Sequence, residues 1–232
     1  MKSKSSLFLF LSFVAGLFAT VTTCAARGPG VCGAGCADDA IREDQAAVVL
    51  SEQARSALLF QIDEERMARE LYLAFGERWN LRPFRNIVQA ETRHEAVLRA
   101  LAKRAGLSLP ETVAGRFTTA VVQERYDTLL ARGRQSAEEA LRTGALVEEQ
   151  DIADLRVLAR STDNVDLRQA VAALERASGH HLAAFVRNMG NSYTAQVLPA
   201  ADVIALTDKA DGGKQSAGRS GRGAGWRGGR AD

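Results

Sequence analysis

The sequence predicts an all-α fold: a four-helix bundle with an extra short helix between the second and third long helices. Apolar residues recur at three- and four-residue steps through the middle of the chain, and the alternation typical of strands is absent. Aromatic residues make up 6% of the chain and prolines number four, which argues against a many-stranded sandwich or barrel. With 232 residues, 46% of them hydrophobic, the chain can build a sizeable core.

The first two long helices have recognisable start and stop signals. Ser51 is a suitable N-cap for a first helix that ends near Trp79. The second helix is expected to open at Pro83, because proline is favoured in the first turn, and to stop near Gly106. These two helices are therefore expected to be neighbours joined by a short connection.

The remaining helices follow after a break at Leu109-Pro110. A short helix is expected over 121–131, in the connection between the second and third long helices. The third long helix begins at Ser136, where Ser-x-x-Glu has the form of a capping box. The fourth is expected over 164–188, and Gly190 is a suitable stop. Short connections between long helices favour a bundle.

Each long helix carries polar residues inside its apolar stripe, near the middle of its length. These residues are Glu65 on the first helix, Glu91 with His94 on the second, Glu148 on the third, and Ser178 with His181 on the fourth. A lone buried carboxylate is costly, and a single buried ion pair is rarely a net stabiliser. A metal site is the simplest common explanation, because cations offset the cost of burying several carboxylates together.

The Glu91-x-x-His94 pair carries the most information. Residues at i and i+3 share a helix face, so this carboxylate and imidazole point toward the same place. Di-iron and di-manganese bundles use one Glu from each of two helices and Glu-x-x-His from each of the other two. Two of the three histidines in the chain lie on inward stripes, whereas His180 points about 100° away from His181 and is expected at the surface.

Four segments carry a resemblance to a known family: DEERMARELY at 63–72, ETRH at 91–94, VEEQDIADL at 147–155 and SGHHLAAF at 178–185. With them the chain resembles the ferritin-like superfamily, in its rubrerythrin/erythrin-like group. It is more closely similar to the bacterial and archaeal family labelled domain of unknown function 2202. The resemblance covers about 51–206 and implies a ferritin-like four-helix bundle.

The resemblance also implies a ligand set. By it the metal ligands would be Glu65, Glu91, His94, Glu148 or Glu149, and His181, with Tyr72 beside the site. Ser178 stands where the superfamily pattern expects a Glu. Glu149 or Glu175 could replace that carboxylate, although both lie off the central stripe, and a site with one metal ion stays open. Asp151 and Asp154 are expected on a solvated face, with arginine salt bridges as the alternative.

Carboxylate oxygens with imidazole suit iron or manganese, as one or two ions, with zinc as a competitor that has no redox chemistry. The implied function is that of a ferritin-like metal-binding protein with ferroxidase or peroxide-reducing activity. Its partners would be metal ions, a small-molecule oxidant and an external electron donor, because no Cys-x-x-Cys pair follows the bundle. No single catalytic residue is assigned. The alternative is a non-enzymatic exported binding or stress protein with a structural metal or none.

The N-terminal segment is expected to direct export. Residues 1–26 read as a signal peptide, with Lys2 and Lys4 before an apolar stretch over 7–18 that is shorter than the roughly 20 residues a membrane span needs. A Gly/Cys-containing linker is expected over 27–50, where Cys32 and Cys36 favour a local disulfide. The protein would be periplasmic or secreted. Cys24 lies in an imperfect lipobox, with Thr23 where Gly, Ala or Ser is usual, so a lipid-anchored form stays open.

The sequence divides the mature chain into the bundle at 51–207 and a Gly/Arg-rich tail at 208–232. The composition of this tail indicates disorder, since it offers too little apolar surface to offset ordering. The whole chain has a formal charge of only +2, so no specific nucleic-acid partner is expected. The tail would at most contact a membrane surface or polysaccharide, and a homo-oligomer stays open.

Overall fold

The computed structural model describes residues 48–217, which form six helices and no strand within that range. The all-helical prediction is therefore confirmed for this part of the chain. None of these helices is long and apolar enough to cross a membrane. The predicted signal peptide, the three cysteines, most of the linker and the end of the Gly/Arg-rich tail lie outside the described residues.

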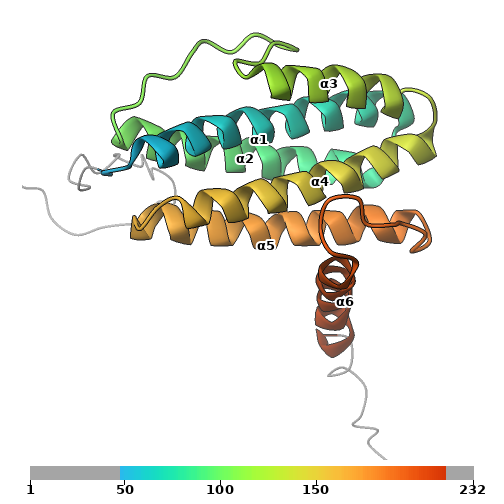
Figure 1. Ribbon diagram of the computed structural model, residues 1–232. Helices are drawn as coiled ribbons and strands as arrows, with labels where there is room; N and C mark the ends of the chain where they lie inside the picture. Colours follow the sequence, from blue (N-terminus) through green and yellow to red (C-terminus); the bar gives the residue numbers. More distant parts are fainter. Residues whose placement is uncertain (1–47, 218–232) are drawn as a thin grey trace, which may run out of the picture. The chain divides into compact units, whose positions relative to one another are not determined.

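Four long helices lie side by side (Figure 1): α1 (Glu52–Trp79), α2 (Arg82–Arg104), α4 (Ala137–Arg160) and α5 (Val165–Asn188). Helix α1 contacts α2 and α4, and α5 contacts the same two helices. The shorter α3 (Ala120–Gly133) lies against α1 and α4, close to the predicted 121–131. Because α3 belongs to a crossover connection, α2 and α4 run in the same direction (Figure 1).

The long helices begin where the local sequence signals place them. Ser51, Ser136 and Asn164 each accept a hydrogen bond from the backbone N–H three residues further on, at 3.0–3.1 Å. Pro83 lies in the first turn of α2, where a missing N–H costs no helical hydrogen bond. After α5 the chain turns through Gly190, which has a φ of 63°.

A sixth helix, α6 (Ala200–Ala217), was not predicted. It packs against α5, and its Val203 is buried. The two helices are close at Gly179 of α5, where an added Cβ would lie 3.1 Å from the Leu206 side chain of α6. The composition of the chain predicts that the tail starts at residue 208, whereas α6 continues past that point to Ala217. Glycine disfavours helix interiors, so Gly212 and Gly213 favoured the prediction of a disordered tail over that of a helix.

The apolar core consists of two clusters, one toward each end of the long helices. The first contains Phe75, Phe84 and Phe185, with ring centroids 5.2–5.5 Å apart for the pairs that Phe84 makes with the other two. The second contains Leu98 and Leu155 with their neighbours. The polar positions of the predicted stripes lie between the two clusters, so the core is interrupted by a buried polar layer.

Candidate metal centre

The five side chains predicted from the stripes meet in this polar layer. Helix α1 contributes Glu65, α2 contributes Glu91 and His94, α4 contributes Glu148, and α5 contributes His181. Their potential ligand atoms form two groups, each within 4.8 Å: Glu65, Glu91 and His94 in one, and Glu91, Glu148 and His181 in the other. The three carboxylate residues are at most 2% exposed. We call these five side chains the acid–histidine cluster.

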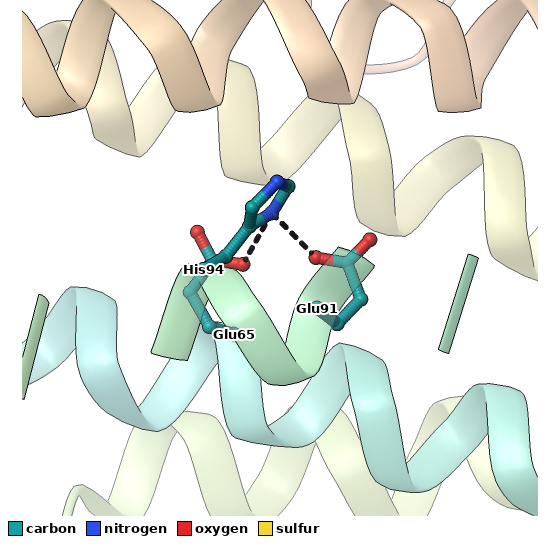
Figure 2. Close-up of side chains that lie close together, drawn as sticks. All are labelled: Glu65, Glu91 and His94. Carbon is teal, nitrogen blue, oxygen red and sulfur yellow. Dashed lines mark hydrogen bonds and ion pairs between the residues drawn. The ribbon is translucent and has the colours of Figure 1, made fainter. Parts of the chain in front are cut away.

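Glu91 joins the two groups, because each of its oxygens faces a different histidine. Its Oε2 lies 2.9 Å from His94 Nδ1 and its Oε1 lies 2.8 Å from His181 Nδ1. The two imidazole rings are stacked, with centroids 5.6 Å apart. Figure 2 shows Glu91 and Glu65 on either side of His94. A carboxylate in this position can bridge two cations.

Glu65 has buried oxygens that the protein leaves unsatisfied. Its Oε2 lies 3.3 Å from His94 Nδ1, which is an ion pair without the geometry of a hydrogen bond. Within the described range, neither oxygen of Glu65 has a hydrogen-bond partner. Buried carboxylate oxygens without donors are costly and rare. A cation bound between Glu65, Glu91 and His94 would satisfy them, so these residues fit a metal ion.

Glu148 is held from the opposite side by Tyr72, the residue that the family resemblance places beside the site. The Tyr72 hydroxyl donates a 2.7 Å hydrogen bond to Glu148 Oε1, while Oε2 lies 3.5 Å from His181 Nδ1. Tyr72 is fully buried among the aromatic rings of the first apolar cluster. This bond fixes one oxygen of Glu148 and leaves the other facing His181.

Protons compensate part of the negative charge that the buried carboxylates bring to the cluster. Burial raises the pKa of Glu65 to about 8, although His94 opposes the shift. For Glu91 burial acts in the same direction, yet its contacts with His181 and His94 prevail and lower its pKa to about 2. Burial lowers the pKa of His94, but Glu65 and Glu91 outweigh it and raise that pKa to about 10. At neutral pH this shift favours the cationic form of His94, and the pKa of His181 is also raised, because Glu148 and Glu91 outweigh the effect of burial.

Glu149, the alternative to Glu148, points away from the cluster. It is fully buried and accepts hydrogen bonds from the backbone N–H groups of Gln196, Val197 and Leu198, and from the Tyr193 hydroxyl. Its oxygens are occupied by the segment that leads into α6. The sequence left the choice between these two residues open, and the structure places Glu148 alone at the cluster.

The other proposed replacement and the third histidine also lie elsewhere. Glu175 is paired with Arg156 at 2.8 Å, and its side chain is 30% exposed. His180 is exposed. Neither residue is close enough to the acid–histidine cluster to join either group.

Asp151 was expected on a solvated face, and this expectation is wrong. The residue is only 6% exposed and accepts hydrogen bonds from Gln61 and Ser178. Burial, followed by the charges of Glu65 and Glu148, raises its pKa well above the usual range. Sequence reasoning missed it because Asp151 directly precedes a stripe position. The available signal was the serine at 178, whose hydroxyl needs a partner when buried.

Asp154 pairs with Arg125 at 3.2 Å, which agrees with the salt-bridge alternative.

Comparisons with known proteins place the chain in a family. Residues 54–207 match the family model described as "Uncharacterized protein domain (DUF2202)". The uncharacterized protein MJ0754 of Methanocaldococcus jannaschii is 33% identical over 156 residues, which are 64% of this chain and 83% of that protein. The crystal structure of hypothetical protein MJ0754 matches with a TM-score of 0.68 and 30% identity, covering 71% of this chain and 97% of that one. The chain belongs to the DUF2202 family.

Proposed function

We propose that this protein is an exported, ferritin-like metal-binding protein that holds iron or manganese in the acid–histidine cluster. The observation that carries the proposal is the pair of three-residue groups joined by Glu91. Both groups combine carboxylate and imidazole ligands in a buried layer, and Glu65 brings two oxygens that no donor among the described residues satisfies.

The arrangement of the helices supports the ferritin-like part of the proposal. Ferritin-like bundles have four long helices and one long crossover connection, and their metal sites lie in the bundle core. Here the crossover is the segment that contains α3, between α2 and α4 (Figure 1). The cluster draws on all four long helices at mid-length, with Glu-x-x-His on α2.

The ligand types support iron or manganese, with zinc as a competitor. When bound, iron would supply one-electron chemistry toward oxygen or peroxide, and an external donor would restore the reduced state. The protein's own part is to hold the ligands in place. Glu91 would bridge the two groups, and Tyr72 would orient Glu148 through its 2.7 Å hydrogen bond.

Metal loading tests the proposal directly. Metal-free protein incubated anaerobically with Fe(II), Mn(II) or Zn(II) is expected to retain at least one ion per chain after gel filtration, as measured by plasma mass spectrometry. At a free metal concentration of about 100 times Kd, binding to the folded state adds about 2.7 kcal/mol. The melting temperature should then rise by roughly 5–10 °C.

A protein that retains no metal and shows no thermal shift with any of the three ions would refute the proposal. If iron is retained, oxygen and peroxide consumption after anaerobic loading separates an enzyme from a passive metal binder. Zinc-loaded protein is the control for that measurement, since it cannot change oxidation state.

Metal affinity is expected to increase with pH, because protons occupy the site in its metal-free form. Metal binding must displace the proton of His94, whose pKa is about 10, and that of Glu65, whose pKa is about 8. Titration with Mn(II) from pH 6 to 8 should show tighter binding and proton release. An affinity that stays constant over this range would contradict the proton occupancy of the cluster.

The metal-free protein should show the opposite dependence in its stability. The folded pKa values of Glu65 and His94 lie above the unfolded values of 4.5 and 6.5, so the folded state binds more protons. Their stabilisation is lost as pH rises, from about 5 to 8 for Glu65 and from about 7 to 10 for His94. Thermal unfolding in the presence of a chelator measures this effect.

Export rests on the N-terminal sequence alone. The basic residues Lys2 and Lys4 and the apolar stretch over 7–18 support it. Mass spectrometry of the mature protein from membrane and soluble fractions tests it. Cleavage near Ala26 supports export, and a lipidated Cys24 indicates the anchored form.

A further inference from the structure

A second polar layer lies one helical turn from the acid–histidine cluster and involves three helices. Gln61 precedes Glu65 by four residues on α1, and Asp151 follows Glu148 by three residues on α4. Ser178 precedes His181 by three residues on α5. Residues three or four apart share a helix face, so each member of this layer lies beside a member of the cluster.

Hydrogen bonds join the three residues of the second layer around one carboxylate. Ser178 Oγ donates to Asp151 Oδ2 at 2.6 Å, and Gln61 Nε2 donates to Asp151 Oδ1. Gln61 and Ser178 are at most 1% exposed. Both donors are neutral, so they fix the position of the Asp151 carboxylate without compensating its charge.

Asp151 has no arginine or lysine within ion-pair distance, unlike three of the other seven buried acids of residues 48–217. Glu64 pairs with Arg125, Asp63 lies 3.6 Å from Arg66, and Glu95 lies within 3.1 Å of both Arg69 and Arg99. Glu149 is satisfied by backbone N–H groups. Among the buried acids of residues 48–217, four have neither an arginine nor a lysine within ion-pair distance nor such a set of backbone donors: Glu65, Glu91, Glu148 and Asp151.

We propose that Asp151 supplies the fourth carboxylate charge of the metal centre, from α4 instead of α5, and thereby makes it a site for two divalent cations. This inference rests on the proposed function. Four carboxylates balance the charge of two divalent ions when both histidines are neutral. Three carboxylates would leave a net positive charge in a buried layer, which is costly. Ser178 stands where the superfamily pattern has a Glu, so α5 lacks that carboxylate. Asp151 replaces the missing charge, and the Ser178 hydroxyl holds the Asp151 carboxylate in place.

The test is a binding titration with Mn(II) alone on Asp151→Asn. Asparagine keeps the size of the side chain. Its one oxygen can accept from Gln61, and its NH2 group can donate to Ser178 Oγ while the serine hydrogen goes to the Leu174 carbonyl, so the change removes charge and little else. The wild type is expected to bind two ions. The variant is expected to bind the second ion about tenfold more weakly or to lose it. Asp154→Asn, one turn further along α4, is the matched control and should keep two ions.

A charge swap provides the second measurement. Asp151→Ser combined with Ser178→Asp conserves the total side-chain volume and moves the carboxylate from α4 to α5. This double variant is expected to regain the second ion. A folded swap variant that still binds one ion would overturn the charge argument. Asp151→Asn with two ions at wild-type affinity would overturn it as well.

The outcomes also separate this inference from the proposed function. A wild-type protein that binds no ion refutes the metal centre itself. A wild-type protein that binds a single ion, with the same affinity in Asp151→Asn, refutes only the role of Asp151. The metal-free Asp151→Asn variant should melt no lower than the wild type, because it loses a buried acid surrounded by other acids. This readout does not depend on metal loading.

Discussion

Replacing Glu91 with alanine is expected to abolish metal binding at both positions of the centre. Among the described residues, Glu91 alone belongs to both groups of potential ligands, with one oxygen toward His94 and the other toward His181. Removing a residue that only supports a ligand costs about 10–100-fold in metal affinity. Removing a shared ligand should cost more than 100-fold, so dialysed Glu91→Ala should carry no metal by plasma mass spectrometry.

Two further variants make this result specific. Gln89→Ala lies on the same helix at an exposed position and should bind metal as the wild type does. His94→Ala removes a ligand from one group only, and should keep an ion in the group of Glu91, Glu148 and His181. Circular dichroism must show that each variant is helical. A helical Glu91→Ala protein with full metal content would refute the centre as described.

The residues of the cluster could be found from sequence because local rules govern them. A helix has one inward face, and apolar neighbours on both sides along that face mark Glu65, Glu91 and Glu148 as inward positions. The spacing between Glu91 and His94 then places the imidazole on the same face. The helix starts at Ser51 and Ser136 follow equally local capping signals.

Asp151, Glu149 and α6 could not be found in this way, because their partners are distant in the chain. Asp151 is held by Gln61 and Ser178, which lie 90 and 27 residues away. Glu149 is about 100° around the helix from Glu148 and binds a segment 44–49 residues later. Hydropathy periodicity marks faces covered by apolar side chains. Glu149 is buried by a loop from a distant part of the chain, so hydropathy periodicity does not predict its burial.

Glu149→Ala is expected to be the most destabilising single substitution in this region while leaving metal binding intact. The carboxylate is fully buried, and its loss leaves the N–H groups of Gln196, Val197 and Leu198 without an acceptor. Hydrogen bonds to charged groups contribute about 1.5–3 kcal/mol each, and they are not additive. We expect a loss of about 3 kcal/mol in the free energy of unfolding. Thermal unfolding should show a melting temperature lower by roughly 6–12 °C.

The same substitution separates a structural role for Glu149 from the ligand role that the sequence left open. Hydrogen exchange should increase over 193–206, since the carboxylate anchors the segment that leads into α6. Glu149→Gln keeps one acceptor and should lie between the wild type and Glu149→Ala in stability. Glu138→Gln, an exposed change on the same helix, should have little effect, because its pair with Arg142 is at the surface. If Glu149→Ala instead lost metal at unchanged stability, Glu149 would be a ligand, and the arrangement of α4 around the centre would have to be revised. The structure predicts lower stability with unchanged metal binding, because both carboxylate oxygens of Glu149 already accept hydrogen bonds from the segment over 193–198.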